Sequence, residues 1–353
     1  MSKNSLNMEA FNPHLNVNSE NTPSKPIIHV MNLTKTFNQE IVAVNNISFQ
    51  VNEGEIFGFL GPNGAGKTTT ISMLTTLLRP TSGTAEVAGY DITKNPSKVR
   101  RAIGVVQQDN TTDRHMTGLE NLIFTARLQG VPKSLAKKRA AELLNLVELS
   151  DAAQRKVETY SGGMRRRLEV ACGLMNMPNV LFLDEPTLGL DVQTRTAIWN
   201  YIKKLKEERS MTLFLTTHYM EEADSLCDRI AIIDHGQIIT YGSSAELKSK
   251  LGGDTIELGI KGEEGDLSQV ISGLPMVKKV TKEGSVYRIK AENGEEAALA
   301  VLEAVKSQGY YVTKILVNKP SLSEVYLELT GRAFREDELG KESRHFFGRS
   351  LSL

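Results

Sequence analysis

The chain has few cysteines, no excess charge of either sign and no long apolar run, and each absence narrows its possible functions. Its 2 cysteines, Cys172 and Cys227, have no cysteine or histidine at metal-ligand spacing, so we expect reduced core residues. The formal net charge is +0 at pH 7. A neutral chain has no global electrostatic attraction for nucleic acid or an anionic membrane, and no nucleic-acid partner is expected.

No apolar stretch approaches the ~18 residues that a membrane-spanning helix needs. The first residues also lack the basic and then apolar layout of a signal peptide. Any role at a membrane is therefore expected to be peripheral. With 353 residues, of which 40% are hydrophobic, the chain is long enough for two domains with sizeable cores.

The most informative segment is Gly61–Thr68, which reads Gly-Pro-Asn-Gly-Ala-Gly-Lys-Thr. Its G-x-x-x-x-G-K-T spacing is that of a P-loop, in which backbone N–H groups surround a phosphate. In this motif Lys67 reaches the β- and γ-phosphates, and the Thr68 hydroxyl is a ligand of Mg²⁺. The expected phosphate-binding residues are Gly61, Pro62, Asn63, Gly64, Ala65, Gly66, Lys67, Thr68 and Thr69.

The segments on either side of this loop support that interpretation. Glu55–Leu60 is a short apolar run typical of a strand, and Thr69–Leu78 has apolar residues at helical spacing. A helix that begins at the loop places its positive N-terminus against the phosphate. We therefore expect the chain to bind a nucleoside triphosphate.

Composition and periodicity divide the chain into several parts. Residues 1–26 are rich in Asn, Ser and Pro and predict a disordered tail. From residue 27 to 252, short apolar runs alternate with helical patterns, which indicates an α/β fold with a buried parallel sheet. Its expected strands are Ile27–Met31, Glu55–Leu60, Ala102–Val106, Val180–Leu183, Thr212–Thr216 and Arg229–Asp234.

The pair Gly252-Gly253 is the expected domain boundary, after a short helix that the capping box Ser243-x-x-Glu246 begins. From 253 to 330 the expected order is β-α-β-β-α-β, which suggests a small ferredoxin-like α+β domain. Its expected strands are 255–260, 276–282, 285–291 and 311–317, and its helices are 266–273 and 294–308. A second capping box, Ser321-x-x-Glu324, begins a last helix, and the charged residues 331–353 predict a flexible tail.

Two carboxylates follow the apolar run Val180–Leu183. In P-loop proteins the first of them, here Asp184, holds Mg²⁺ opposite the P-loop hydroxyl. The second, Glu185, is placed to orient or deprotonate the water that attacks the γ-phosphate. Two surface acids after a strand would look the same, but their position after a P-loop favours the functional interpretation.

Ser161-Gly162-Gly163 begins another helix. A hydroxyl, two glycines and free N–H groups at a helix start form a second phosphate-binding feature. One γ-phosphate hardly needs two such features from one chain. We therefore expect each to serve a different nucleotide, so that a second subunit completes the site.

Two more motifs, Gly189-Leu190-Asp191 and Thr217-His218, follow along the chain. Together and in this order, the motifs resemble those of the ATP-binding subunit of an ABC transporter, and the resemblance covers about residues 27–250. Three segments have sequences most similar to those of the daunorubicin-type drug-resistance exporters, namely Tyr160–Leu168, Gly189–Arg195 and Thr217–Ala223. That subgroup also carries a C-terminal extension, which ends in a segment similar to Pro320–Val325.

The resemblance implies roles for further residues. Phe37 matches the aromatic residue that stacks on adenine, and Asp191 matches an aspartate at the dimer interface. His218 would contact the γ-phosphate and hold the attacking water with Glu185. Gln108 matches the glutamine that links Mg²⁺ and water to a helical subdomain, and its neighbour Gln107 is the alternative. The implied catalytic residues are Lys67, Gln108, Glu185 and His218, and the implied metal ligands are Thr68, Gln108 and Asp184.

The chain departs from the common Leu-Ser-Gly-Gly-Gln motif of this family, because Tyr160 and Met164 occupy the first and last positions of the motif. Ser161 and Gly163 are intact, so catalysis is expected, but the missing glutamine removes a polar contact near the ribose. Residues 110–176 resemble the helical subdomain that docks on the membrane partner. The basic clusters Lys137–Arg139 and Arg165–Arg167 are interpreted as solvated faces.

The expected function is an ATP hydrolase at the cytoplasmic face of the cell membrane. A homodimer closes around two ATP–Mg²⁺ and drives export through a separate integral membrane permease. The main alternative is a soluble ABC-type ATPase of translation or DNA repair, which usually carries two P-loops or a long coiled coil. Import and a P-loop kinase are further alternatives. The domain after Gly253 is either regulatory or part of the dimer interface.

Overall fold

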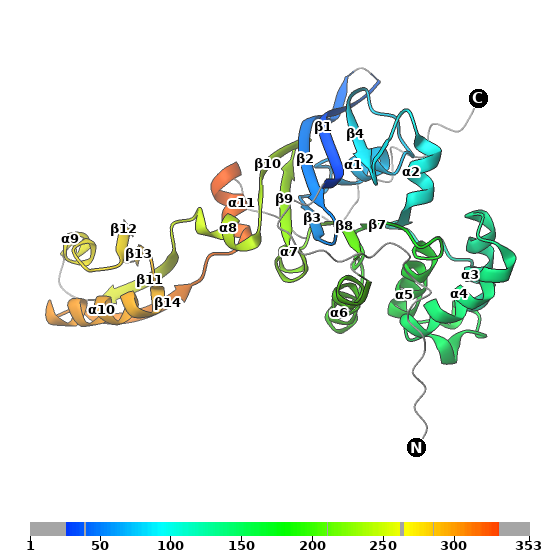
Figure 1. Cartoon of the computed structure of the whole chain (residues 1–353). Coiled ribbons are helices and arrows are strands. Elements are labelled where there is room, and N and C mark those ends of the chain that lie inside the picture. The colour runs from blue at the N-terminus through cyan, green and yellow to red at the C-terminus, as the bar shows by residue number, and fades with distance from the viewer. Residues whose placement is uncertain (1–25, 39, 210, 262–264, 285, 332–353) are drawn as a thin grey trace, which may run out of the picture.

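The computed structural model describes residues 26–331, apart from 39, 210, 262–264 and 285. The tails expected at 1–26 and 331–353 lie outside the described residues, except at Pro26 and Gly331. Figure 1 shows a large body with two sheets, a group of helices on one side of it, and a smaller unit of sheet and helices on the other. In the described part of the chain, no helix is long and apolar enough to cross a membrane.

The centre of the large body is a six-stranded sheet in the order β10-β9-β3-β8-β7-β6. Its strands are β3 (Ile56–Leu60), β6 (Ile103–Val106), β7 (Val180–Asp184), β8 (Thr212–Thr217), β9 (Arg229–Asp234) and β10 (Gln237–Gly242). All neighbours run parallel except β10, which pairs antiparallel with β9 at the edge. The expected parallel α/β core is confirmed, and β10 is a strand that the sequence patterns did not predict.

A second sheet is antiparallel, in the order β2-β1-β4-β5. Its strands are β1 (Pro26–Phe37), β2 (Ile41–Asn52), β4 (Ser82–Val87) and β5 (Tyr90–Asp91). The placement of Ile27–Met31 in the parallel sheet is therefore wrong, because these residues belong to β1. Along β2 the buried Ile47, Phe49 and Val51 alternate with exposed polar residues, which is the pattern of a sheet with one solvated face.

The two sheets share a hydrophobic core with helices α1 (Lys67–Leu74) and α2 (Pro96–Ala102). Phe49 of the antiparallel sheet stacks on Phe57 of the parallel sheet, with ring centroids 5.5 Å apart and planes 9° apart. Phe214 of β8 joins the same aromatic cluster. The residues of β3 that lead into the P-loop are thus buried between two layers.

A second core covers the opposite face of the parallel sheet, where Leu181, Leu183 and Leu213 pack with helical side chains. The helices are α3 (Gly118–Leu128), α4 (Lys133–Leu146), α5 (Gly162–Gly173), α6 (Val192–Arg209) and α7 (Met220–Leu226), with short turns at Ser150–Ala152 and Val157–Thr159. Ala140 and Leu144 of α4 are buried in this core. Both cysteines are free, with Cys172 buried and Cys227 half-buried, as expected.

The smaller unit is an antiparallel sheet in the order β12-β13-β11-β14, with its own hydrophobic core. Its elements are β11 (Asp254–Lys261), α9 (Ser268–Ser272), β12 (Val277–Glu283), β13 (Val286–Ala291), α10 (Gly294–Ser307) and β14 (Tyr311–Asn318). The order β-α-β-β-α-β is the expected one, and this strand order belongs to the ferredoxin-like arrangement. Figure 1 shows the unit extending away from the large body.

The last helix, α11 (Leu322–Thr330), returns to the large body. Leu322, Val325 and Tyr326 pack in one cluster with residues of α7, β9 and α8 (Ser244–Ser249). Both expected capping boxes are present, at Ser243 with Glu246 and at Ser321 with Glu324. The division of the chain at Gly252-Gly253 stays a prediction. Helix α11 follows this division in the sequence, but in space it packs against the large body.

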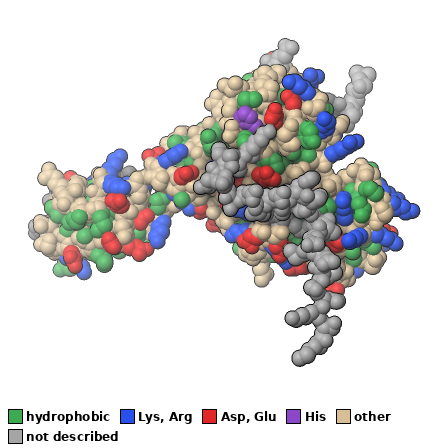
Figure 2. All heavy atoms as spheres, in the orientation of Figure 1, with side chains coloured by type: hydrophobic (Ala, Val, Ile, Leu, Met, Phe, Trp, Pro, Cys, Tyr) green, Lys and Arg blue, Asp and Glu red, His purple; other side chains and the backbone are tan. Residues whose placement is uncertain are grey.

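The charges on the face shown in Figure 2 are mixed, because acidic and basic side chains are interspersed over both the large body and the smaller unit. This distribution agrees with the formal net charge of +0. This face therefore gives no reason to expect long-range electrostatic attraction toward an anionic partner.

Candidate active site

The P-loop connects the end of β3 to Lys67, the first residue of α1. Gly66 has a φ of 103°, a left-handed conformation that favours glycine, and a Cβ there would lie 2.5 Å from the carbonyl oxygen of Ala43. A Cβ on Gly61 would lie 2.3 Å from the carbonyl oxygen of Ile233. The loop therefore requires glycine at Gly66 for its backbone conformation and at Gly61 for space.

Helix α1 begins earlier and ends earlier than its apolar pattern predicts. It ends at Leu74, because Thr76 has a φ of 64° and the Leu78 N–H donates back to the Ser72 carbonyl at 2.9 Å. Leu77, which the pattern places on the buried face, is 63% exposed. The predicted helix end at Leu78 is thus wrong. A helix does follow the loop as expected, but it begins at Lys67, two residues before the predicted start at Thr69.

Lys67 is buried, and its ammonium group points back across the P-loop. It donates to the carbonyl oxygens of Gly61 at 2.9 Å and Pro62 at 3.1 Å. Its Nζ also lies 3.2 Å from Oε1 of Glu185. Burial lowers the pKa of Lys67, and the negative charge of Glu185 opposes that shift.

Asp184 ends β7 opposite the P-loop helix. Its Oδ1 accepts hydrogen bonds from Thr68 Oγ1 at 3.4 Å and from Thr216 Oγ1 at 2.5 Å. Burial raises the pKa of Asp184, and these two hydroxyl donors partly offset that increase. The structure thus places the hydroxyl and the carboxylate predicted to share Mg²⁺ next to each other.

Glu185, the residue after Asp184, has a φ of 46°, which is unusual for a residue other than glycine. Its amide donates to the backbone oxygen of Thr216 at 3.2 Å and to the Thr216 hydroxyl at 3.1 Å. Its Oε1 lies 3.2 Å from Nδ1 of His218 as well as near Lys67. Burial raises the pKa of Glu185, but the contacts to His218 and Lys67 outweigh burial, and the net pKa is lowered.

The segment Ser161–Gly163 begins α5 as expected, but in a different part of the molecule. Ser161 caps the helix, because its Oγ accepts the Met164 N–H at 3.2 Å. Asp191 caps α6 in the same way, with Thr194 donating its N–H at 2.9 Å and its hydroxyl at 2.6 Å. The hydrogen bonds from Thr194 lower the pKa of the Asp191 carboxyl.

An open groove of about 530 Å³ lies between the starts of these two helices, and Ser161 and Gly163 line it together with Gln193, Thr194 and other residues of α6. Its lining, taken from the described residues, includes none of the P-loop. The second predicted phosphate-binding feature therefore lies in a groove that the first, the P-loop, does not line.

Two further predicted residues lie on exposed loops or strand ends. Phe37 is the last residue of β1 and is 37% exposed, with Nζ of Lys35 5.2 Å from its ring centroid. Gln108 is exposed and follows β6 by two residues. The role of Phe37, and that of Gln108 with Gln107 as its alternative, stay predictions.

Two residues that organise this site do not follow from the sequence motifs. Thr216 bonds to both Asp184 and Glu185, and its position near the end of β8, two residues before His218, is the available signal. Arg166 was interpreted with its neighbours as part of a solvated face, and this is wrong, since Arg166 is 6% exposed and bonds to the backbone after β7. A run of three arginines at a helix start does not reveal which of them turns inward.

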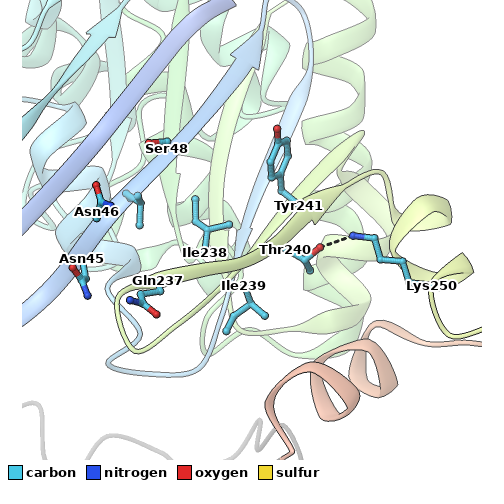
Figure 3. Close-up of a pocket in the computed structure, with 10 residues that line it drawn as sticks. Asn45, Asn46, Ser48, Gln237, Ile238, Ile239, Thr240, Tyr241 and Lys250 are labelled. Atoms are coloured by element: carbon cyan, nitrogen blue, oxygen red, sulfur yellow. Dashed lines mark hydrogen bonds between the residues drawn. The ribbon is translucent and has the colours of Figure 1, made fainter.

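A second open groove, of about 580 Å³, lies away from the P-loop between β2 and β10. Figure 3 shows its mostly polar lining, with Asn45 and Asn46 on one side, Gln237 and Tyr241 on the other, and the hydrogen bond from Lys250 to Thr240. None of the predicted nucleotide-binding residues lines it. We assign it no part in the site.

The parallel sheet with a P-loop between β3 and α1 defines a P-loop nucleoside triphosphatase. Comparison with protein families agrees: a model described as "ABC transporter" matches residues 44–188, and one described as "ATP-binding protein DrrA1-3-like, C-terminal domain" matches residues 242–330. The chain is 42% identical over 308 residues to the doxorubicin resistance ATP-binding protein DrrA of Mycobacterium tuberculosis, covering 85% of this chain and 92% of that protein. It is 40% identical over 313 residues to the linearmycin resistance ATP-binding protein LnrL of Bacillus subtilis, covering 88% of this chain and 100% of that protein.

Solved structures give the same result for the large body. The cbiO1 protein of Clostridium perfringens, described as part of the ABC transporter complex cbiONQ, matches with a TM-score of 0.60 and 26% identity, covering 64% of this chain and 92% of that one. A dimeric ATP-binding cassette bound to ADP and phosphate matches with a TM-score of 0.55 and 29% identity, covering 61% of this chain and 98% of that one. The chain therefore belongs to the ABC transporter family, in the DrrA-like group of ATP-binding subunits, and it is an ATP hydrolase coupled to transmembrane transport.

Proposed function

We propose that two copies of this chain close face to face around two ATP molecules and drive export through a separate integral membrane permease. The observation that carries the proposal is the position of Glu185, whose Oε1 lies 3.2 Å from both Lys67 and His218 at the end of the parallel sheet. Ligands of open α/β sheets bind at the carboxyl ends of the strands. The buried charges of this chain therefore converge where the γ-phosphate of ATP would lie.

The proposed reaction is displacement by water at the γ-phosphate. Glu185 accepts a proton from the attacking water or orients it, and the lowered pKa of Glu185 keeps that carboxylate ionised at neutral pH. His218 holds the carboxylate in place through its Nδ1. Lys67 stabilises the charge that develops on the phosphate oxygens, and for this its ammonium must exchange the Glu185 carboxylate for phosphate when ATP binds.

The described residues fit a magnesium ion next to the P-loop. Thr68 and Asp184 offer a hydroxyl and a carboxylate oxygen, which are hard ligands of the kind that Mg²⁺ prefers, and Gln108 is a further proposed ligand. Among the described residues no cluster of three or more His, Cys, Asp or Glu side chains could hold a metal by itself. Mg²⁺ usually completes its shell with water and phosphate oxygens, and when bound here it would neutralise charge on the β- and γ-phosphates.

The need for a second copy is inferred from the placement of Ser161 and Gly163. They line a groove with α6 and lie apart from the P-loop of their own chain. A helix start with a hydroxyl and free N–H groups binds phosphate, so we propose that this surface meets the ATP on the P-loop of the partner copy. One of the similar solved structures is itself described as dimeric and bound to ADP and phosphate.

The proposal of export rests on relatives described as resistance proteins for doxorubicin, daunorubicin and linearmycin. The place of action would be the cytoplasmic face of the membrane, where a permease contacts the helices α3 to α5. Phe37 is proposed to stack on the adenine, because its ring is partly exposed at a strand end.

The test is the substitution Glu185→Gln, which keeps the size of the side chain but removes the base. We expect ATPase activity to fall about 10²-fold or more, while ATP still binds and an ATP-dependent dimer accumulates in size-exclusion chromatography. Glu221→Gln is a matched control, because Glu221 lies exposed on α7 nearby.

Full activity of Glu185→Gln, or a chain that stays monomeric with bound ATP, would overturn the mechanism. Export is tested separately, by co-purifying the chain with a candidate permease and measuring substrate transport in vesicles. Stimulation of the ATPase by the permease, with substrate moving outward, is the expected result. Inward movement or the absence of any membrane partner contradicts it.

A further inference from the structure

Arg166 connects three segments that lie far apart in the sequence. Its guanidinium is almost fully buried and makes four hydrogen bonds. Nε donates to the carbonyl of Pro186 at 2.7 Å, Nη2 to the carbonyl of Asp184 at 3.1 Å, and Nη1 to the carbonyl of Gln107 at 2.7 Å. Nη1 also donates to Glu169 at 2.9 Å, which neutralises the buried charge.

The neighbouring arginines do nothing comparable. Arg165 donates to the carbonyl of Tyr160 at 2.9 Å, and Arg167 donates to the carbonyl of Val147 at 3.0 Å, so both stay within the helical group. A planar guanidinium can donate in several fixed directions at once, which an ammonium cannot. Of this run of arginines, Arg166 is thus the one that extends from α5 to the end of the parallel sheet.

The carbonyls that Arg166 holds lie on either side of Glu185. The carbonyl of Asp184 belongs to the peptide that precedes Glu185, and the carbonyl of Pro186 lies one residue after it. From the other side, Thr216 holds the Glu185 amide. Because Glu185 has a φ of 46°, its backbone needs such support to keep an unusual conformation.

We propose that Arg166 is a positioning residue for hydrolysis, which sets the direction of the Glu185 carboxylate by holding the backbone on both sides of it. This inference rests on the proposed role of Glu185 as the base. Arg166 also joins that backbone to Gln107, beside the expected glutamine at Gln108, and to α5, whose start carries Ser161. A change at either place is transmitted to the base through one rigid guanidinium.

The first experiment compares Arg166→Lys and Arg166→Met in steady-state ATPase assays. Misplacing a catalytic group by about 1 Å can cost ~10²-fold in rate, so we expect kcat to fall at least ~10-fold in both variants. The KM and the affinity for ATP should change less than ~2-fold, because the P-loop is untouched. Arg139→Lys is the matched control, since Arg139 also donates to a backbone carbonyl of the helical group but does not contact the site.

The second experiment is a double-mutant cycle with Glu185→Gln, measured in single turnovers. If Arg166 acts through Glu185, Arg166→Met lowers the rate at least ~10-fold in the native chain but less than ~2-fold in the Glu185→Gln chain. Equal losses in both backgrounds would overturn the inference, as would a fall in kcat matched by an equal rise in KM.

These outcomes separate this inference from the proposed function. If Glu185→Gln alone keeps full activity, Glu185 is not the base, and the proposed mechanism and the positioning role of Arg166 are both overturned. If Glu185→Gln is inactive but the Arg166 effects are additive, only the positioning role fails. Circular dichroism and ATP binding are measured for every variant, and Arg166→Lys, which keeps the positive charge, serves when Arg166→Met does not fold.

Discussion

The proposed site has two halves that are constructed differently. The first lies at the carboxyl ends of β7 and β8, and the second lies at the N-termini of α5 and α6. In the first half, Lys67, Asp184, Glu185 and His218 are buried and contact one another directly or through threonine hydroxyls. In the second half, Ser161 and Asp191 are exposed, and within the part of the chain that the structure describes their side chains bond to their own helices.

This contrast indicates which half is formed within a single chain. Buried charges need partners, and the first half supplies them within one chain, so its geometry is set before a ligand arrives. The charged residue of the second half, Asp191, is exposed and needs no buried counter-charge, and the helix starts of this half face an open groove. Such a surface is suited to a ligand carried by another molecule, which is why we assign the chemistry to the first half and partner recognition to the second.

The largest effect is expected from Lys67→Ala, which removes the only positive charge that the P-loop contributes, counted over its described residues 61–68. Loss of one donor that stabilises transition-state charge costs about 10²–10³-fold in rate. An ATPase assay with Lys94→Ala as the control measures this, because the Lys94 side chain is 81% exposed. Activity within about tenfold of the native chain would show that the buried half is not where the chemistry occurs.

An intermediate effect is expected from Ser161→Asp, which tests the outward half. Aspartate caps a helix as well as serine does, so α5 should keep its start, but the new negative charge would face the phosphate of the partner's ATP. We expect the ATP-dependent dimer to weaken and the ATPase rate to fall about 10-fold or more, since like charges at an interface cost several kcal/mol.

The ATP affinity of the monomeric Ser161→Asp chain should not change, because its own P-loop is unaltered. Asn293→Asp, at the cap of α10 in the smaller unit, is the control. If ATP binding by the monomer falls as much as dimer formation does, the separation of the site into two halves is wrong.

The smallest effect is expected from Glu222→Gln, at the junction between the halves. Glu222 is buried on α7 and accepts hydrogen bonds from Thr187 and from Trp199 of α6, both at the same oxygen. Burial raises the pKa of Glu222 despite these donors. The carboxyl of Glu222 therefore stays protonated to higher pH in the folded chain than in the unfolded chain. The free energy of unfolding of the native chain consequently falls as the pH rises from the usual pKa of a glutamate to the raised pKa of the folded state.

Glutamine keeps the accepting oxygen and has no proton to lose, so Glu222→Gln should gain stability relative to the native chain as pH increases. The gain is about 1.4 kcal/mol for every tenfold difference in proton affinity between the folded and unfolded states. Urea unfolding at pH 5 and pH 8 measures it. A stability difference that is the same at both pH values contradicts the assignment.

Features that depend on short segments could be predicted from the sequence. The P-loop, the buried strands on either side of the nucleotide site and the two capping boxes each occupy fewer than about ten residues and follow from local chemistry. The placement of Ile27–Met31 failed because an isolated apolar run does not show whether its neighbours run parallel or antiparallel. The end of α1 failed because Thr76 takes a left-handed conformation that its side chain gives no reason to expect.

The spacing of Gly61 to Thr68 is enough to predict that this chain binds a triphosphate, since it places backbone donors, a lysine and a hydroxyl in one short loop. The residues that complete the site around that loop come together through the tertiary fold. Thr68 and Asp184 are 116 residues apart, yet they share a hydrogen bond, and Arg166 is buried because carbonyls from two other segments surround it. A charge can be buried only where distant backbone groups satisfy it, and no local pattern shows where those groups will be.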